Sequence, residues 1–214
     1  MNLHPNKIYH IFNEGNKRQI LFHQESDYLL FLEMVENLIV PTAEIIAFSL
    51  EPENFQFMLY VDNRVNKQLQ VGNLFLDPIT NGFRKLLSGY ARRFNKRYNK
   101  TGSVFRQKTK SKCITDLNNL IGDGIGYYTD CFHHIHQKVV KKGVVNKIED
   151  WKYSSFRYYA GLSDNDGVCN KNLAVQYCNY DPKRFMEDSK CVVSEFLGDF
   201  LDGWLNFHSD QEQY

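Results

Sequence analysis

Hydrophobic positions change their period along the first 61 residues. Three segments rich in aromatic and β-branched residues predict strands, at residues 7–13, 43–50 and 55–61. Between the first two, apolar residues over 28–39 recur every three or four positions, which predicts an amphipathic helix that ends before Pro41. Only residues 51–53 separate the second and third segments, so these two strands are expected to pair antiparallel.

The rest of the chain predicts mainly helices. Residues 103–114 have an extended pattern, and the helices are expected over 83–98, from Asp116 through Tyr127–Gln137, and over 194–207. The order strand, helix, strand, strand, helix, strand, helix predicts an α+β fold. Its centre is expected to be an antiparallel β-sheet with helices packed on it, followed by a C-terminal helical extension.

Composition places the chain among cytoplasmic globular proteins. Hydrophobic residues make up 43% of its 214 residues, and no apolar stretch approaches the ~20 residues that span a bilayer. The first ten residues lack the apolar core of a signal peptide. The five cysteines form no Cys-x-x-Cys pair, which favours free thiols over a metal site or a disulfide. No membrane partner is expected.

The net charge of +1 conceals a strongly basic segment. Residues 84–112 contain eleven Lys or Arg and no Asp or Glu, whereas residues 161–214 carry a net charge of −6. Such a segment can follow a phosphate backbone. The candidate DNA-binding residues are Arg84, Lys85, Arg92, Arg93, Lys96, Arg97, Lys100, Arg106, Lys108, Lys110 and Lys112. The interleaved Tyr90, Phe94, Tyr98 and Phe105 have the spacing of a core stripe, with stacking on unpaired bases as the alternative.

Four motifs in order resemble the single-tyrosine HUH transposases, in particular the branch called REP-associated tyrosine transposases. They are Tyr-His-Ile-Phe-Asn-Glu-Gly-Asn at 9–16, Thr-Gly-Ser-Val-Phe-Arg-Gln at 101–107, the segment 135–145 that begins Ile-His, and Asp-Trp-Lys-Tyr-Ser-Ser-Phe at 150–156. The resemblance covers about residues 7–161. It implies a ferredoxin-like, HUH transposase-like DNA-binding domain over 1–161, with 162–214 as an acidic C-terminal extension packed on or tethered to it.

The sequence departs from this family where its chemistry takes place. The resemblance puts the two metal-binding histidines at Asn54 and Gln56, the nucleophilic tyrosine at His134, and an assisting Asn or Gln at Lys138. The family uses Mg²⁺ or Mn²⁺, but neutral amides are poor ligands by themselves, so no cofactor is expected. Lys138 lies one helical turn after His134, and its ammonium is expected to replace the charge of the metal.

Three functions remain open on the sequence alone. The first is a catalytically inactive DNA-binding protein that recognises single-stranded or hairpin DNA, as the resemblance implies. The second is an active transposase that nicks and rejoins single-stranded DNA with substituted residues, in which His134 is the candidate nucleophile. The third is a protein-interaction module whose basic segment meets an acidic partner. The resemblance is compatible with a monomer or a homodimer. The basic segment is expected to open onto the pocket formed by the four substituted positions.

Overall fold

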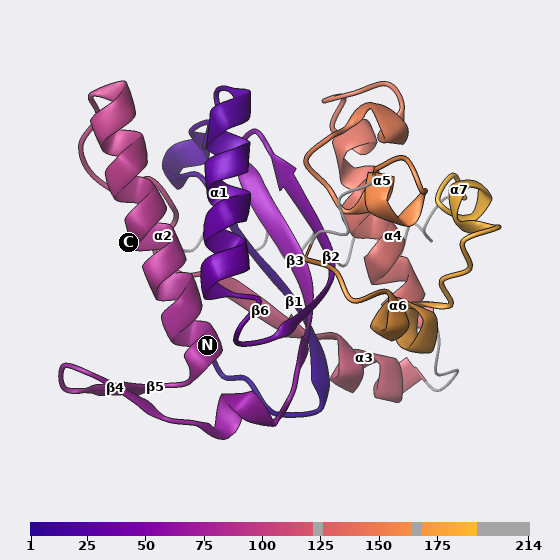
Figure 1. Cartoon of the computed structure of the whole chain (residues 1–214), viewed down its shortest axis with the longest axis horizontal. Coiled ribbons are helices and arrows are strands. Elements are labelled where there is room, and N and C mark those ends of the chain that lie inside the picture. Colours follow the sequence, from indigo (N-terminus) through magenta and orange to yellow (C-terminus); the bar gives the residue numbers. More distant parts are fainter. Residues whose placement is uncertain (122–125, 164–167, 192–214) are drawn as a thin grey trace.

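A computed structural model describes residues 1–121, 126–163 and 168–191 of the chain. Its centre is a four-stranded antiparallel sheet in the order β2-β3-β1-β6 (Figure 1). The strands are β1 (Lys7–Glu14), β2 (Glu44–Glu51), β3 (Asn54–Val61) and β6 (Lys110–Cys113). This sheet with its covering helices confirms the predicted α+β fold, and the first three strands lie within one residue of their predicted bounds.

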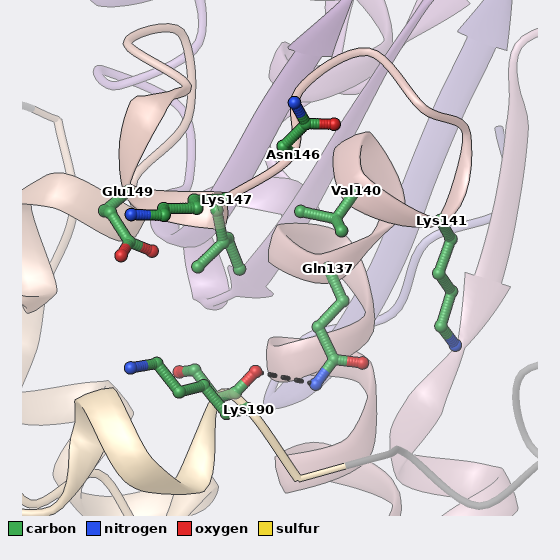
Figure 2. Close-up of a pocket in the computed structure, with 9 residues that line it drawn as sticks. Gln137, Val140, Lys141, Asn146, Lys147, Glu149 and Lys190 are labelled. Atoms are coloured by element: carbon green, nitrogen blue, oxygen red, sulfur yellow. Dashed lines mark hydrogen bonds between the residues drawn. The ribbon is translucent and has the colours of Figure 1, made fainter.

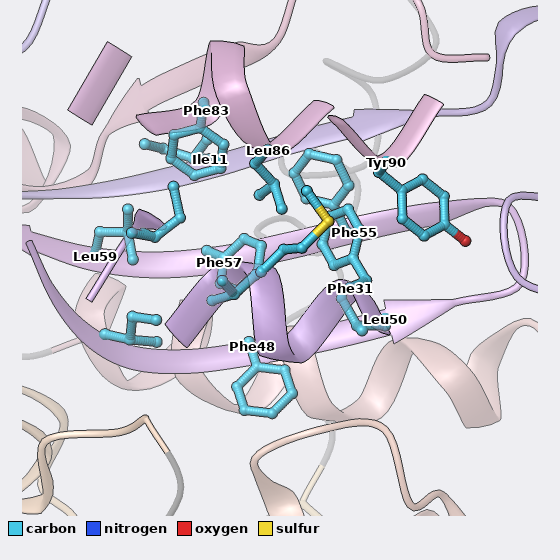
Figure 3. Close-up of a cluster of buried hydrophobic side chains, with 14 of the residues drawn as sticks. Ile11, Phe31, Phe48, Leu50, Phe55, Phe57, Leu59, Phe83, Leu86 and Tyr90 are labelled. Atoms are coloured by element: carbon cyan, nitrogen blue, oxygen red, sulfur yellow. The ribbon is translucent and has the colours of Figure 1, made fainter. Parts of the chain in front are cut away.

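Two long helices cover one face of the sheet, α1 (Glu25–Leu38) and α2 (Pro78–Tyr98). Their apolar stripes pack on the inward side chains of the strands, and Phe31, Phe57 and Phe83 are among the fully buried residues (Figure 3). The two helices approach closely at Gly82, where a Cβ atom would lie 2.6 Å from the carbonyl oxygen of Leu38. Burial of these aromatic rings supplies a large share of the hydrophobic stabilisation.

The opposite face of the sheet is covered by α4 (Gly126–Lys141), with shorter helices around it (Figure 1). These are α3 (Ile114–Ile121), α5 (Phe156–Tyr159), α6 (Lys171–Cys178) and α7 (Phe185–Asp188). Phe132 of α4, Tyr159 of α5 and Phe185 of α7 belong to one buried cluster. The described part of the C-terminal region therefore packs into the same core as α4.

A small hairpin precedes α2 and projects from the body of the protein (Figure 1). It consists of β4 (Leu69–Val71) and β5 (Leu74–Leu76), with Leu74 and Phe75 largely exposed at its end. Three short 3₁₀ helices complete the described elements, at Asn16–Arg18, Asn63–Asn66 and Ile148–Asp150. Strands of three residues are too short to produce a periodic sequence signal, so no element was predicted here.

Several predicted bounds differ from the observed ones. Helix α2 begins five residues earlier than predicted, because Asp77 accepts a hydrogen bond from the Thr80 amide (2.8 Å) and Pro78 suits the first turn. Residues 103–114 form a strand only over β6 and an isolated bridge between Phe105 and Gly15. The helix expected to start at Asp116 is two helices, α3 and α4. The helix expected over 194–207 lies outside the described residues. Within the described ranges, no helix is long and apolar enough to cross a membrane.

Candidate functional site

A buried polar cluster lies between the sheet and α4. Antiparallel register places Glu51 opposite Asn54 at the end of the β2–β3 hairpin, and Ser49 opposite Gln56 two pairs further along. Their side chains share the sheet face that carries Met58 and Ile8, which contact the α4 cluster. Strand pairing thus gathers polar side chains under a helix, where polar groups need partners.

The Glu51 carboxylate is the centre of this cluster. Its Oε1 accepts a hydrogen bond from Gln56 Nε2 (2.8 Å), and its Oε2 accepts one from Asn54 Nδ2 (2.8 Å). Lys142, the residue directly after α4, places its Nζ 2.7 Å from the same Oε2. Glu51 is only 1% exposed. Two amides and one ammonium group thus compensate a carboxylate that is removed from water.

His10 on β1 continues the network on the other side of Gln56. Its Nε2 lies 3.0 Å from Gln56 Oε1, and since that amide oxygen can only accept, Nε2 carries the proton. Burial lowers the pKa of His10 to about 3, with further lowering by the charges of His134 and Lys138. The imidazole is therefore neutral at physiological pH and acts as a hydrogen-bond donor to Gln56.

The four positions that the resemblance singles out come together in this cluster. Asn54 and Gln56 are hydrogen-bonded to Glu51, while His134 and Lys138 project from α4 close enough to influence the ionisation of His10. All four are buried, from 0% exposure for His134 to 7% for Asn54. The spacing of four residues places His134 and Lys138 on one face of α4, and Lys142 continues that face by one more turn.

The residues of this cluster do not fit a divalent metal ion. Mg²⁺ and Mn²⁺ prefer oxygen ligands, but Asn54 and Gln56 turn their amide nitrogens toward Glu51, and the Gln56 oxygen accepts from His10. Lys142 already binds the carboxylate. Two like unit charges 4 Å apart repel by about 4 kcal/mol at an effective dielectric constant of about 20, and a divalent ion doubles this. Among the described residues, no group of three or more His, Cys, Asp or Glu is placed to hold a metal.

The basic segment lies mostly on the other side of the sheet. Helix α2 packs on the face opposite α4, so the expectation that the whole segment opens onto the substituted positions is wrong. Lys112 alone is paired in register with His10; it is 9% exposed, and burial lowers its pKa to about 8. The reason is topological, because the chain crosses from α2 to the edge strand β6 between residues 98 and 110.

Some of the predicted DNA-binding cations have partners inside the protein. Arg97 forms an ion pair with the buried Asp27, and Arg106 pairs with Glu14 at 2.7 Å. These acidic partners lie far away in the sequence, which is why the segment looks unpaired in the sequence alone. The Lys100 ammonium lies 5.2 Å from the centre of the Phe94 ring. Fewer cations of this segment are therefore available to bind a phosphate backbone than its composition indicates.

Three exposed cations of α2 form a separate ridge, which we call the α2 crest. Its members are Lys85, Arg92 and Lys96. Within the part of the chain that the structure describes, none of them has an ion-pair partner. The aromatic residues of the segment do not join this ridge, since Tyr90, Phe94 and Phe105 are at most 5% exposed in the core and Tyr98 donates its hydroxyl hydrogen to Asp27. The core-stripe interpretation of these rings is correct.

A groove runs beside the α2 crest. It has a volume of about 660 Å³ and lies between α2 and residues 102–111. Apolar side chains such as Leu87 and Val104 line it, together with the cations Arg84, Arg106 and Lys108. Cations beside an apolar wall are the combination that accommodates a phosphate and an unpaired base.

A second basic pocket lies at the end of α4 (Figure 2). It has a volume of about 530 Å³, and Lys141, Lys147 and Lys190 are among the residues that line it. Gln137 is held in its wall by hydrogen bonds to the carbonyl oxygens of Ser189 (2.9 Å) and Cys191 (2.7 Å). This pocket is on the flank of α4 rather than beneath it, and its residues take no part in the Glu51 network.

Three residues of the cluster were missed in the sequence. Glu51 follows the second predicted strand and shows no signal beyond its spacing of three and five residues from Asn54 and Gln56. His10 lies inside the first strand in a sequence motif, and Lys142 belongs to an ordinary run of lysines. Only the packing of α4 on the sheet identifies Glu51 as the residue that all of these groups surround.

Comparison with known proteins supports the fold. No protein-family model matches the chain, and no curated protein matches it. A solved structure of a REP-associated tyrosine transposase bound to a REP hairpin matches with a TM-score of 0.50 and 13% identity, covering 79% of this chain and 95% of that chain. At this identity the similarity concerns the fold alone, which resembles that of the transposase.

Proposed function

We propose that this protein binds DNA through the α2 crest and the adjoining groove, and that it does not cleave DNA by a metal-dependent mechanism. The observation that carries the proposal is the exposure of Lys85, Arg92 and Lys96 beside a groove lined by further cations. The similar transposase was solved with a DNA hairpin. The expected partner is therefore single-stranded or hairpin DNA.

Electrostatics supports a polyanionic partner. Each phosphate that a Lys or Arg neutralises releases condensed counterions, so binding gains free energy that falls steeply as salt rises. The cations of the crest repel one another in the free protein, and a phosphate backbone relieves this repulsion. The apolar wall of the groove offers unpaired bases a surface that double-stranded phosphates alone would not use.

The Glu51 cluster supports the absence of metal-dependent cleavage. Cleavage requires a nucleophile that reaches the phosphate, yet His134 is fully buried and the amide nitrogens of Asn54 and Gln56 are directed to Glu51. We therefore expect DNA binding to be unchanged by EDTA. Incubation with a hairpin substrate should trap no covalent protein–DNA adduct, and an adduct at His134 would favour the active transposase instead.

The binding proposal is tested by fluorescence anisotropy with a labelled hairpin that has a single-stranded flank. The triple variant Lys85→Ser, Arg92→Ser and Lys96→Ser should weaken binding about 10-fold or more at 0.1 M salt, because three phosphate contacts are lost. It should also reduce the slope of log K against log salt by about 2 to 3.

A matched control removes the same charge from positions outside the α2 crest and the adjoining groove. Lys152, Lys183 and Lys190 are exposed and lie in the region of α5 and α7. Their replacement by serine should leave the salt slope within experimental error of the original. Equal losses in the two triple variants would show that net charge, rather than the α2 crest, determines affinity.

A further inference from the structure

The cation next to Glu51 belongs to the chain itself. The Glu51 side chain is 1% exposed, whereas the Lys142 side chain is 43% exposed and reaches inward from the end of α4. Exposed ion pairs contribute little to stability because water already solvates both partners. Here one partner is removed from water, so loss of its counter-ion leaves a buried charge with reduced compensation.

Among the described residues, the polar groups that contact the Glu51 carboxyl group are all donors. A carboxylate accepts at both oxygens, and both of its oxygens receive N–H donors from Asn54 and Gln56. The orientation of Gln56 in turn fixes the proton of His10 at Nε2. The contacts with Glu51 thus set the orientations of Asn54 and Gln56, and through Gln56 that of His10.

The location of the ion pair also connects distant elements. Glu51 ends β2, Asn54 begins β3, and Lys142 follows the last residue of α4. The turn between the strands receives the amides of Gly15 at the Glu53 carbonyl oxygen (2.8 Å) and Leu21 at the Pro52 carbonyl oxygen (2.7 Å). The ion pair therefore fastens the end of α4 to a turn on which the β1–α1 connection is also anchored.

We propose that Lys142 is the resident counter-ion of a closed cation site formed by Glu51, Asn54 and Gln56. Its ammonium pairs with the Glu51 carboxylate, which orients the two amides, and takes the place in which a divalent ion would otherwise bind that carboxylate. Lys138 approaches the same cluster from one turn earlier and adds positive charge that further disfavours a divalent ion. The proposal is independent of DNA binding, which is measured separately.

The test combines thermal unfolding of four variants at low salt. Lys142→Met keeps the length of the side chain but removes the charge, and it should lower Tm by about 5 °C or more. Glu51→Gln should also lower Tm, and the double variant should be no less stable than the less stable single variant, because each change removes the same interaction. Lys141→Met, an exposed neighbour, is the control and should leave Tm within about 1 °C.

A second measurement follows free Mn²⁺ by electron paramagnetic resonance during titration of the unaltered protein. The proposal expects that Glu51 binds no Mn²⁺. The unaltered protein and the Glu51→Gln variant should therefore take up the same amount of Mn²⁺. Mn²⁺ uptake that depends on Glu51 would overturn the proposal. In the unfolding experiment, a Lys142→Met variant as stable as Lys141→Met would overturn it, and so would additive losses of Tm in the double variant. Anisotropy with hairpin DNA on the same variants separates this result from the binding proposal, since Lys142 lies outside the α2 crest.

Discussion

In the polar cluster, the hydrogen-bonding role and charge of each side chain depend on its neighbours as well as on its residue type. The sequence shows only that residue 56 carries an amide. In the structure, the Gln56 side chain bridges two residues: its oxygen accepts a hydrogen bond from His10, and its nitrogen donates one to Glu51. His10 is neutral because it is buried, and its Nδ1 has no hydrogen-bond partner within the described part of the chain. A buried acceptor without a partner opposes folding, so the cluster is stabilised mainly by the bonds to Glu51.

The depressed pKa of His10 makes stability depend on pH. In the unfolded chain a histidine takes up its proton near pH 6.5, whereas His10 in the folded protein resists protonation down to about pH 3. The unfolded state therefore binds more protons below pH 6.5, and the free energy of unfolding should decrease as pH falls from 7 to 5.

In the His10→Gln variant, the decrease in the free energy of unfolding between pH 7 and pH 5 should be smaller by about 2 kcal/mol or less. Urea unfolding at pH 7 and at pH 5 measures this difference. Burial also lowers the pKa values of His133 and His136, so part of the pH dependence should remain in the variant. The exposed His4→Gln serves as the matched control. An unchanged pH dependence in His10→Gln would contradict a buried neutral imidazole.

At the level of elements, α1 and α2 are joined by one buried carboxylate. Asp27 in the first turn of α1 accepts the backbone amides of His23 (3.0 Å) and Gln24 (3.2 Å), and it also pairs with Arg97. The same side chain thus caps one helix and holds the end of the other. This contact holds the C-terminal end of α2 against α1 and so helps to position the α2 crest.

Substitution of this carboxylate tests the connection. Asp27→Asn should lower the free energy of unfolding by about 2 to 4 kcal/mol, because Arg97 and the Tyr98 hydroxyl lose a charged partner that is 2% exposed. Chemical denaturation measures the loss. Glu33→Gln, on the exposed side of α1, should change stability by less than about 0.5 kcal/mol. Similar effects of the two substitutions would show that Asp27 acts only through net charge.

At the scale of the whole molecule, the sheet separates the exposed cations of α2 from the buried polar cluster around Glu51. The α2 crest lies on the face that carries α1 and α2, and the Glu51 cluster lies beneath α4 on the other face. Substitutions in the buried cluster are therefore free to accumulate without altering the exposed cations. Under the proposed function, this separation allows the DNA-binding surface to be altered independently of the buried cluster.

The acidic end of the chain carries negative charge, which opposes the approach of a polyanion. Residues 192–214 contain five Asp or Glu and no Lys or Arg, so their replacement by the corresponding amides changes the net charge from +1 to +6. The variant should bind hairpin DNA more tightly at low salt, by about 3-fold or more, and the difference should vanish near 0.5 M salt where screening is strong. A difference that persists at high salt would instead indicate direct blocking of the groove.

The sequence by itself determined the first three strands and the two long helices α1 and α2, because alternation and helical spacing directly reflect which side chains face a core. Residues 7–13, 43–50 and 55–61 were recognisable as strands for this reason. Through the family resemblance it also singled out Asn54, Gln56, His134 and Lys138, which the structure places in or beside one buried polar cluster. What only the tertiary structure decided is which face each group occupies. The crossing from α2 to β6 separates the basic helix from that cluster, and long-range packing brings Glu51 to Lys142 and Asp27 to Arg97, contacts between residues 70 or more positions apart that no local pattern encodes.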